Sequence, residues 1–335
     1  MPHHADNRNG GSPPAGPGHR VRSACRAMLR VLAVPVLLAT PAGAEFYSAA
    51  DMARVADRAI PSLRAALQDG IIAHMPRDQR PLADGISLAF PERGPHPMAF
   101  FSDPATGTIY MPLESIRFFD DIATLTAWFH GRGCSQDHVH SYLWSLLRKG
   151  RAMPSPLRAF ALDRDALLAD PYTNSLSDRF YSSGLLFILA HETGHLVLRH
   201  RAGLTAAASQ AQEIAADDFA TRHFTSVGTM PMGVLIYYLA AWWRDPEGRA
   251  AATGTHPVSA ARIRALARHM LDDPAAFSHA EADAGPVAQQ RVRDVAGLLN
   301  GIADSIAEDG MLSLMPRSLD RDYPASRFPS ACPAD

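Results

Sequence analysis

The sequence is poor in cysteine, in lysine and in long apolar runs, and neither sign of charge is in large excess. Lys149 is the single lysine among 32 basic residues, and 34 acidic residues bring the formal net charge to −2. A nucleic-acid-binding domain usually carries a clear basic surplus, so we expect no nucleic-acid partner. With 335 residues, 47% of them hydrophobic, the chain is long enough to bury a sizeable core.

The apolar runs of the chain are too short to cross a bilayer. Two stand out, at 31–39 and at 230–243, and Arg244 follows the second directly. A membrane-spanning helix needs about 20 apolar residues. We therefore expect a buried helix at 230–243 and no transmembrane helix in the mature chain.

The first run has the flanks of a secretory signal. Arginines precede residues 31–39, and Ala42 and Ala44 supply the small residues of a cleavage site. This pattern is typical of a signal peptide, which we assign to residues 1–44, with Met28 as a possible true start. The protein is then predicted to be exported, to the periplasm or the extracellular space. A buried strand at 31–39 is the alternative interpretation.

The few cysteines fit an oxidising compartment. Cys25 leaves with the predicted signal peptide, so Cys134 and Cys332 remain as an even pair. Disulfides form and persist in exported proteins. We predict that Cys134 and Cys332 pair.

Apolar periodicity predicts a mainly helical domain with one small sheet. Short apolar segments bounded by Pro and Gly predict three strands of an antiparallel sheet, and helical spacing of apolar residues predicts the helices. The expected class is α+β, with one domain at 45–310 and an irregular tail at 311–335. The expected strands are 85–90, 98–102 and 108–111, and the expected helices are 48–68, 113–129, 138–147, 177–200, 210–224, 231–243, a basic helix that ends at His269, and 287–306.

The helix at 177–200 carries the chemistry, and Ser177 and Gly203 are its expected N-cap and C-terminal stop. His191 and His195 stand one turn apart on it, on one face, so both can reach one Zn²⁺ at about 2.0–2.1 Å. Glu192 lies about 100° away around the helix and flanks the metal without binding it. There it can act as the general base and proton carrier of a hydrolysis.

A third metal ligand is expected after a turn, on the next helix. Glu213 opens the sequence Glu-Ile-Ala-Ala-Asp, which ends at Asp217. A catalytic zinc needs three protein ligands and one open position, and Glu213 supplies the third. Asp217 is one turn further on the same face, where it can accept the Nδ1–H of a ligand histidine. The small residues Ala215 and Ala216 allow the two helices to approach closely.

These motifs resemble the gluzincin metallopeptidases, in particular the M48 group, in a compact variant. The resemblance implies a zincin-like fold, a zinc-activated water, and a peptide laid along an edge strand. It implies a metalloendopeptidase with a polypeptide substrate. Together with the predicted signal peptide, this places the expected substrates among exported or envelope proteins. The segments that carry it are His191-Glu192-x-x-His195, Glu213-x-x-Ala216-Asp217, Thr255-His256-Pro257 with Arg262-Ile263, and Pro97-Met98-Ala99-Phe100 before Thr108-Ile109-Tyr110.

His256 is the remaining candidate for the active site. We expect the loop before Pro257 to fold back so that His256 faces the metal. There it could donate a hydrogen bond to the oxyanion of the tetrahedral intermediate, or occupy the open metal position and keep the enzyme latent. A third interpretation is that it only caps the next helix.

Other residues have simpler interpretations. His200 is expected to be solvated on the opposite side of its helix, and His138 and His140 could form a second metal site. Tyr237 and Tyr238 are expected in the core or the groove wall, where one of them could support an oxyanion. Two alternatives to a peptidase stay open. The protein could be a secreted zincin-shaped binding protein without turnover, or the two histidines could be core residues that bind no metal.

Overall fold

The computed structural model describes the part of the chain that carries the predicted metal ligands. All described residues belong to one compact unit, Ala42–Asp335. The predicted signal peptide, the C-terminal tail, His256 and Cys332 lie outside the described residues, so the predictions about them stay predictions. The described ranges are 46–201, 204–244, 258–283 and 285–307.

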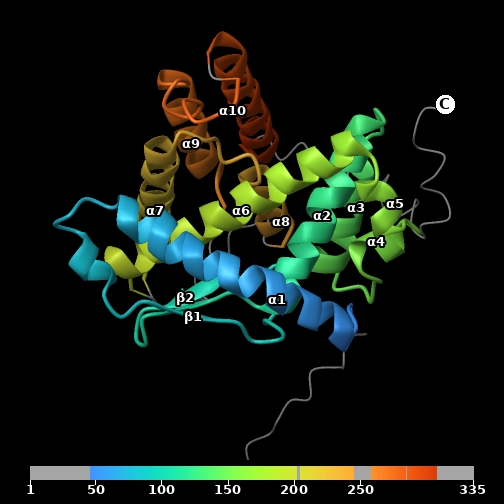
Figure 1. Cartoon of the computed structure of the whole chain (residues 1–335), viewed down its shortest axis with the longest axis horizontal. Helices are drawn as coiled ribbons and strands as arrows, with labels where there is room; N and C mark the ends of the chain where they lie inside the picture. The colour runs from blue at the N-terminus through green and yellow to red at the C-terminus, as the bar shows by residue number, and fades with distance from the viewer. Residues whose placement is uncertain (1–45, 202–203, 245–257, 284, 308–335) are drawn as a thin grey trace, which may run out of the picture. The chain divides into compact units, whose positions relative to one another are not determined.

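The structure confirms the mainly helical α+β class (Figure 1). Every predicted helix is present, with shifted ends, and two of them, 48–68 and 138–147, end in a π-helical segment. The α-helices are α1 (Ala49–Ala65), α2 (Leu113–Gly131), α3 (Asp137–Leu143), α4 (Pro156–Ala159), α5 (Arg164–Leu168), α6 (Pro171–Val197), α7 (Ala206–Val227), α8 (Val234–Arg244), α9 (Ala260–Asp272) and α10 (Pro286–Ala307). The other helical segments are the π-helices η1 (Ala66–Ile72) and η3 (Trp144–Arg148) and the 3-10 helix η2 (Arg80–Ala83).

Helix α6 begins earlier than Ser177, the predicted N-cap. Asp170 caps it instead, because its carboxylate accepts a hydrogen bond from the Thr173 backbone N–H over 2.9 Å and Pro171 occupies the first helical position. Ser177 lies inside the helix, and its hydroxyl is 2.9 Å from the Thr124 hydroxyl on α2. The extra turns therefore serve the packing of α6 against α2.

Helix α6 is the centre of the packing (Figure 1). It contacts α2, α7, α8 and strand β2, and its middle residues, from Phe187 to Ala190, are fully buried. The start of α8 comes very close to it, because a Cβ on Gly233 would lie 2.0 Å from the Phe180 carbonyl oxygen. Glycine is required at Gly233 for this reason, and the close contact holds the start of α8 against the middle of α6, at Phe180 and Gly184.

The sheet is mixed, not antiparallel as expected. Its strands are β1 (Ser87–Ala89), β2 (Phe101–Asp103) and β3 (Thr108–Tyr110), in the order β1-β3-β2. A tight turn that includes Gly107, at φ +65, makes β2 and β3 an antiparallel hairpin, whereas β1 pairs with β3 in parallel. Strand pairing joins residues far apart in the sequence, so apolar alternation does not reveal it. The order leaves β2 at one edge, next to α6.

The apolar run at 230–243 forms helix α8, which is buried as predicted. Tyr238, Trp242 and Trp243 are among its fully buried side chains. Among the described residues, none of the helices combines the length and the apolar character needed to cross a bilayer.

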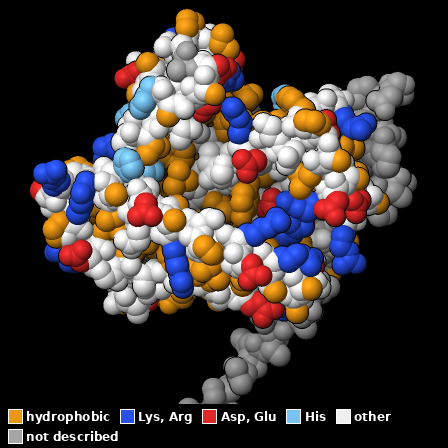
Figure 2. Space-filling view, viewed as in Figure 1, with side chains coloured by type: hydrophobic (Ala, Val, Ile, Leu, Met, Phe, Trp, Pro, Cys, Tyr) orange, Lys and Arg blue, Asp and Glu red, His pale blue; other side chains and the backbone are white. Residues whose placement is uncertain are grey.

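A buried carboxylate joins the start of the described chain to α2. The Tyr47 hydroxyl donates to Asp121 over 2.9 Å, and the guanidinium groups of Arg117 and Arg164 lie 3.0 and 3.4 Å from the same carboxylate. Burial raises the pKa of Asp121 to about 6, although Arg117 acts in the opposite direction. Figure 2 shows basic and acidic side chains side by side on this face, near α1 and α5.

Candidate metal centre

Helices α6 and α7 hold the three predicted ligands against one another. The two helices approach closely at Gly194, where a Cβ would lie 3.1 Å from the Phe219 Cβ and 3.3 Å from the Ala216 Cα. The small residue Ala216 was expected to permit this approach. Because α7 packs directly on the last turns of α6, Glu213 faces His191 and His195.

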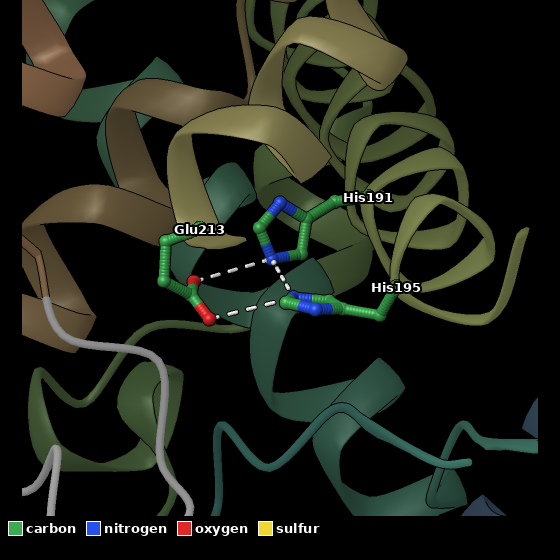
Figure 3. A group of neighbouring side chains, drawn as sticks. All are labelled: His191, His195 and Glu213. Carbon is green, nitrogen blue, oxygen red and sulfur yellow. Dashed lines mark hydrogen bonds and ion pairs between the residues drawn. The ribbon is translucent and has the colours of Figure 1, made fainter. Parts of the chain in front are cut away.

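The three side chains converge on one point (Figure 3). The Nε2 atoms of His191 and His195 are 3.0 Å apart, and each lies 3.4 Å from a carboxylate oxygen of Glu213. A tetrahedral zinc with bonds of about 2.0–2.1 Å would hold its ligand atoms about 3.3 Å apart. The spacing and the donor set therefore fit a divalent metal such as zinc. Within the described ranges, this is the one group of three or more potential ligands that meets so closely, and His138 and His140 are not part of it.

The outward nitrogen of His191 is held by Asp217. His191 Nδ1 lies 2.8 Å from Asp217 Oδ1, and both side chains are buried. A carboxylate in this position would fix the tautomer of a ligand histidine and turn its Nε2 toward a metal ion. The structure thus brings Asp217 to the place that the sequence predicted for it.

Arg262 connects the two carboxylates. Its Nε and Nη2 donate to Asp217 over 2.7 and 2.9 Å, and its Nη1 lies 2.8 Å from Glu213. The Arg262 side chain is fully buried, so it balances charge that burial would otherwise make costly. The sequence marked Arg262 only as part of a resemblance, and nothing local indicated that α9 would carry it to the metal ligands.

These contacts shift the pKa of both partners. Burial acts to lower the pKa of His191, but its hydrogen bonds to Asp217 and Glu213 raise it to about 10. Burial acts to raise the pKa of Asp217, yet Arg262 and His191 hold it below its usual value. Without a metal ion, the site therefore favours an imidazolium between two carboxylates.

Glu192 lies beside the cluster and is not one of its ligands. It is fully buried, and Ser102 on β2 donates a hydrogen bond to its Oε2 over 2.8 Å. The predicted edge strand thus lies next to α6, the helix that carries His191 and His195. Ser102 was not singled out from the sequence, because a lone serine in a strand carries no local signal of a contact with α6.

His200 is not solvated on the far side of the helix, contrary to the expectation. Its Nδ1 lies 2.8 Å from Nδ1 of His195, and the residue is only partly exposed. The reason is that α6 ends at Val197, and Arg199, with φ +56, reverses the chain. The expected stop, Gly203, lies outside the described residues and follows the actual end of the helix.

A cavity of about 680 Å³ opens beside the ligands. His195, His200 and Glu213 line it, together with Ser102 and with Tyr237 on α8, whereas Tyr238 does not. Burial raises the pKa of Tyr237, and the charge of Glu192 adds to the effect. Tyr237 therefore keeps its proton and can donate a hydrogen bond into the cavity.

The comparisons with known proteins agree with this chemistry at the level of a peptidase. The comparison with curated proteins and the comparison with solved structures gave no match. A model of the Peptidase U49 family matches residues 137–281. This segment contains His191, Glu192, His195 and Glu213, as well as Asp217 and Arg262. Over these residues the chain is similar to a peptidase family, which supports peptidase activity with a polypeptide substrate.

Proposed function

We propose that the protein is a zinc-dependent metalloendopeptidase. The observation that carries the proposal is the buried His191, His195 and Glu213 cluster, whose ligand spacing fits a tetrahedral metal. The cluster lies inside the segment that matches a peptidase family. The motifs that resemble the M48 gluzincins support a zincin-like active site.

Each residue of the site has a distinct role in this proposal. Bound zinc supplies Lewis-acid polarisation of a carbonyl and lowers the pKa of a water molecule. Glu192 accepts a proton from the attacking water and delivers it to the leaving amine. Asp217 and Arg262 hold His191 and Glu213 in place. Tyr237, protonated and in the cavity wall, donates to the oxygen that gains charge.

The substrate of this enzyme is an extended polypeptide. Strand β2 is at the edge of the sheet, and its residues Phe101 and Ser102 line the cavity beside His195. An extended peptide can pair with such an edge through main-chain hydrogen bonds. Leu146 and Leu147 of η3 also line the cavity, which favours an apolar side chain near the cleaved bond.

The site of action is proposed from the sequence alone. The basic, apolar and small-residue pattern that ends at Ala44 supports cleavage before Glu45 and export to the periplasm or beyond. The substrates are then exported or envelope proteins. N-terminal sequencing of the exported protein tests this, and a product that keeps residues 31–39 would contradict it.

The deciding experiment measures metal content and turnover separately. We expect one zinc per purified chain and cleavage of unfolded casein. Glu192→Gln should retain the zinc and lose about 10²–10⁴-fold of the activity, because the base is removed and no ligand is. Glu92→Gln, an exposed carboxyl on the loop after β1, is the matched control and should behave like the wild type.

The same measurements separate the alternatives. Stoichiometric zinc without turnover would favour a zincin-shaped binding protein. A chain that binds no zinc would leave the two histidines as core residues and reject the proposal.

A further inference from the structure

Both ligand imidazoles are held at the nitrogen that faces away from the cluster. His191 is held by the carboxylate of Asp217, as expected for a metal ligand. His195 has a different partner, the imidazole of His200, at 2.8 Å between the two Nδ1 atoms. The two rings stand nearly perpendicular, at 75°.

The end of α6 places His200 against His195. The His200 backbone N–H donates to the His195 carbonyl over 2.9 Å, and the Arg199 N–H donates to the Leu196 carbonyl over 3.1 Å. With Arg199 in the left-handed region at φ +56, this is the hydrogen-bond pattern of a Schellman motif. The motif places His200 next to His195, the third residue from the helix end, so the backbone brings the two side chains within reach of each other.

The hydrogen-bond pattern assigns the protons of this pair. His195 Nε2 faces His191 and Glu213, so a metal there needs its lone pair and the ring hydrogen must be on Nδ1. A separation of 2.8 Å then requires a lone pair on His200 Nδ1. His200 is accordingly the acceptor, with its own hydrogen on Nε2.

We propose that His200 is a positioning residue for the metal: it fixes the tautomer and the ring orientation of His195. The inference rests on the proposed metal site and extends it to a residue outside the ligand motif. His200 lines the cavity, yet as a neutral acceptor it adds no charge beside Glu213. His200 thus holds the ring of His195 by accepting its Nδ1–H, as Asp217 does for His191.

Two substitutions separate this role from simple packing. His200→Phe keeps a ring of similar size and removes the acceptor, whereas His200→Asn gives up the ring and keeps an acceptor near the position of Nδ1. Zinc affinity is measured by competition with a chelator. We expect His200→Phe to bind zinc about 10–100-fold more weakly than the wild type, and His200→Asn to recover most of the loss.

Controls make each outcome decisive. His269→Ala removes an exposed histidine of α9 that is paired with Asp218 and should leave zinc affinity unchanged. If His200→Phe does not fold, His200→Ala is measured in its place and should show the same loss of zinc affinity. Wild-type affinity in the Phe or Ala variant, or an Asn variant weaker than the Phe variant, overturns the inference.

His191→Ala separates this inference from the proposed function. Loss of stoichiometric zinc in His191→Ala, together with wild-type affinity in His200→Phe, would reject the role of His200 alone. Zinc retained by His191→Ala would reject the metal site itself, and the role of His200 with it.

Discussion

Ser102 on the edge strand β2 donates a hydrogen bond of 2.8 Å to Oε2 of Glu192 on α6. The contact joins the strand that is proposed to bind substrate to the residue that is proposed to move the proton. Glu192 is fully buried, whereas Ser102 lines the cavity. The position of the base therefore depends on the sheet as well as on its own helix.

Ser102→Ala should slow turnover without loss of metal. The hydroxyl holds one oxygen of a buried carboxylate, and a hydrogen bond to a charged group is worth about 1.5–3 kcal/mol. We expect kcat to fall about 10-fold or more, with unchanged zinc content. Ser87→Ala on β1, whose hydroxyl pairs with Thr108, is the control. An unchanged kcat in Ser102→Ala would show that the contact does not position Glu192.

Asp217→Ala should weaken zinc binding because Asp217 holds His191. It should also destabilise the fold because Asp217 pairs with the buried Arg262. Loss of the carboxylate beside His191 is expected to weaken zinc about 10–100-fold. It also leaves Arg262 buried without its bidentate partner, which costs about 3–5 kcal/mol of unfolding free energy. The second substitution Arg262→Met should recover stability but not zinc affinity. Chemical denaturation and chelator competition measure the two effects.

Asp218, the residue next to Asp217, provides the control for Asp217→Ala. Asp218 is partly exposed and pairs with His269 at the surface, so Asp218→Ala should change neither quantity. Equal effects of Asp217→Ala and Asp218→Ala would contradict the assignment.

Zinc binding should release about one proton at pH 7.5. The pKa of His191 is raised to about 10 by Asp217 and Glu213, so before metal binds this ring is protonated, and a ligand histidine must be neutral. Apparent affinity should then rise about tenfold per pH unit below that pKa and level off above it. Calorimetry in buffers of different ionisation enthalpy counts the protons. A count of zero would show that His191 is already neutral.

The stability of the fold should fall as pH rises through the titration of Asp121. The folded-state pKa is about 6, above the ordinary value of 3.8, mainly because of burial. The folded state therefore binds this proton more tightly, and the contribution is fully present below about pH 4 and lost as pH rises through 6. The shift corresponds to about 3 kcal/mol. Asp121→Asn should flatten the denaturation profile between pH 4 and 7, whereas the exposed Asp84→Asn should not.

Cys134 is predicted to pair with Cys332. The structure records Cys134 as disulfide-bonded, and the predicted partner lies outside the described residues. Peptide mapping without reduction should find the two cysteines in one cross-linked product, and reduction should lower the unfolding free energy by about 2–5 kcal/mol. A cross-link to Cys25 in the full chain would show that the pairing was assigned wrongly.

The sequence alone determined those parts of the site that depend on local spacing. Two histidines four residues apart share a helix face whatever surrounds them, and Glu213 and Asp217 share the face of the next helix for the same reason. The positions of the longer helices and of the three strands also followed from apolar periodicity, apart from their ends. Ser177 and Gly203 were wrongly predicted as the two ends of α6. Several residues near a helix end can satisfy its free backbone groups, and the sequence does not show which of them does so.

Only the tertiary structure decided the contacts that cross between elements. Arg262 reaches the ligands because α9 packs on α7, and Ser102 reaches Glu192 because β2 is the edge strand beside α6. The parallel pairing of β1 with β3 is equally non-local. His200 is close to His195 in sequence, yet its place depends on a left-handed backbone at Arg199, a conformation that this residue type does not signal. Side-chain periodicity assumes that the helix continues, and here the helix ends three residues before His200.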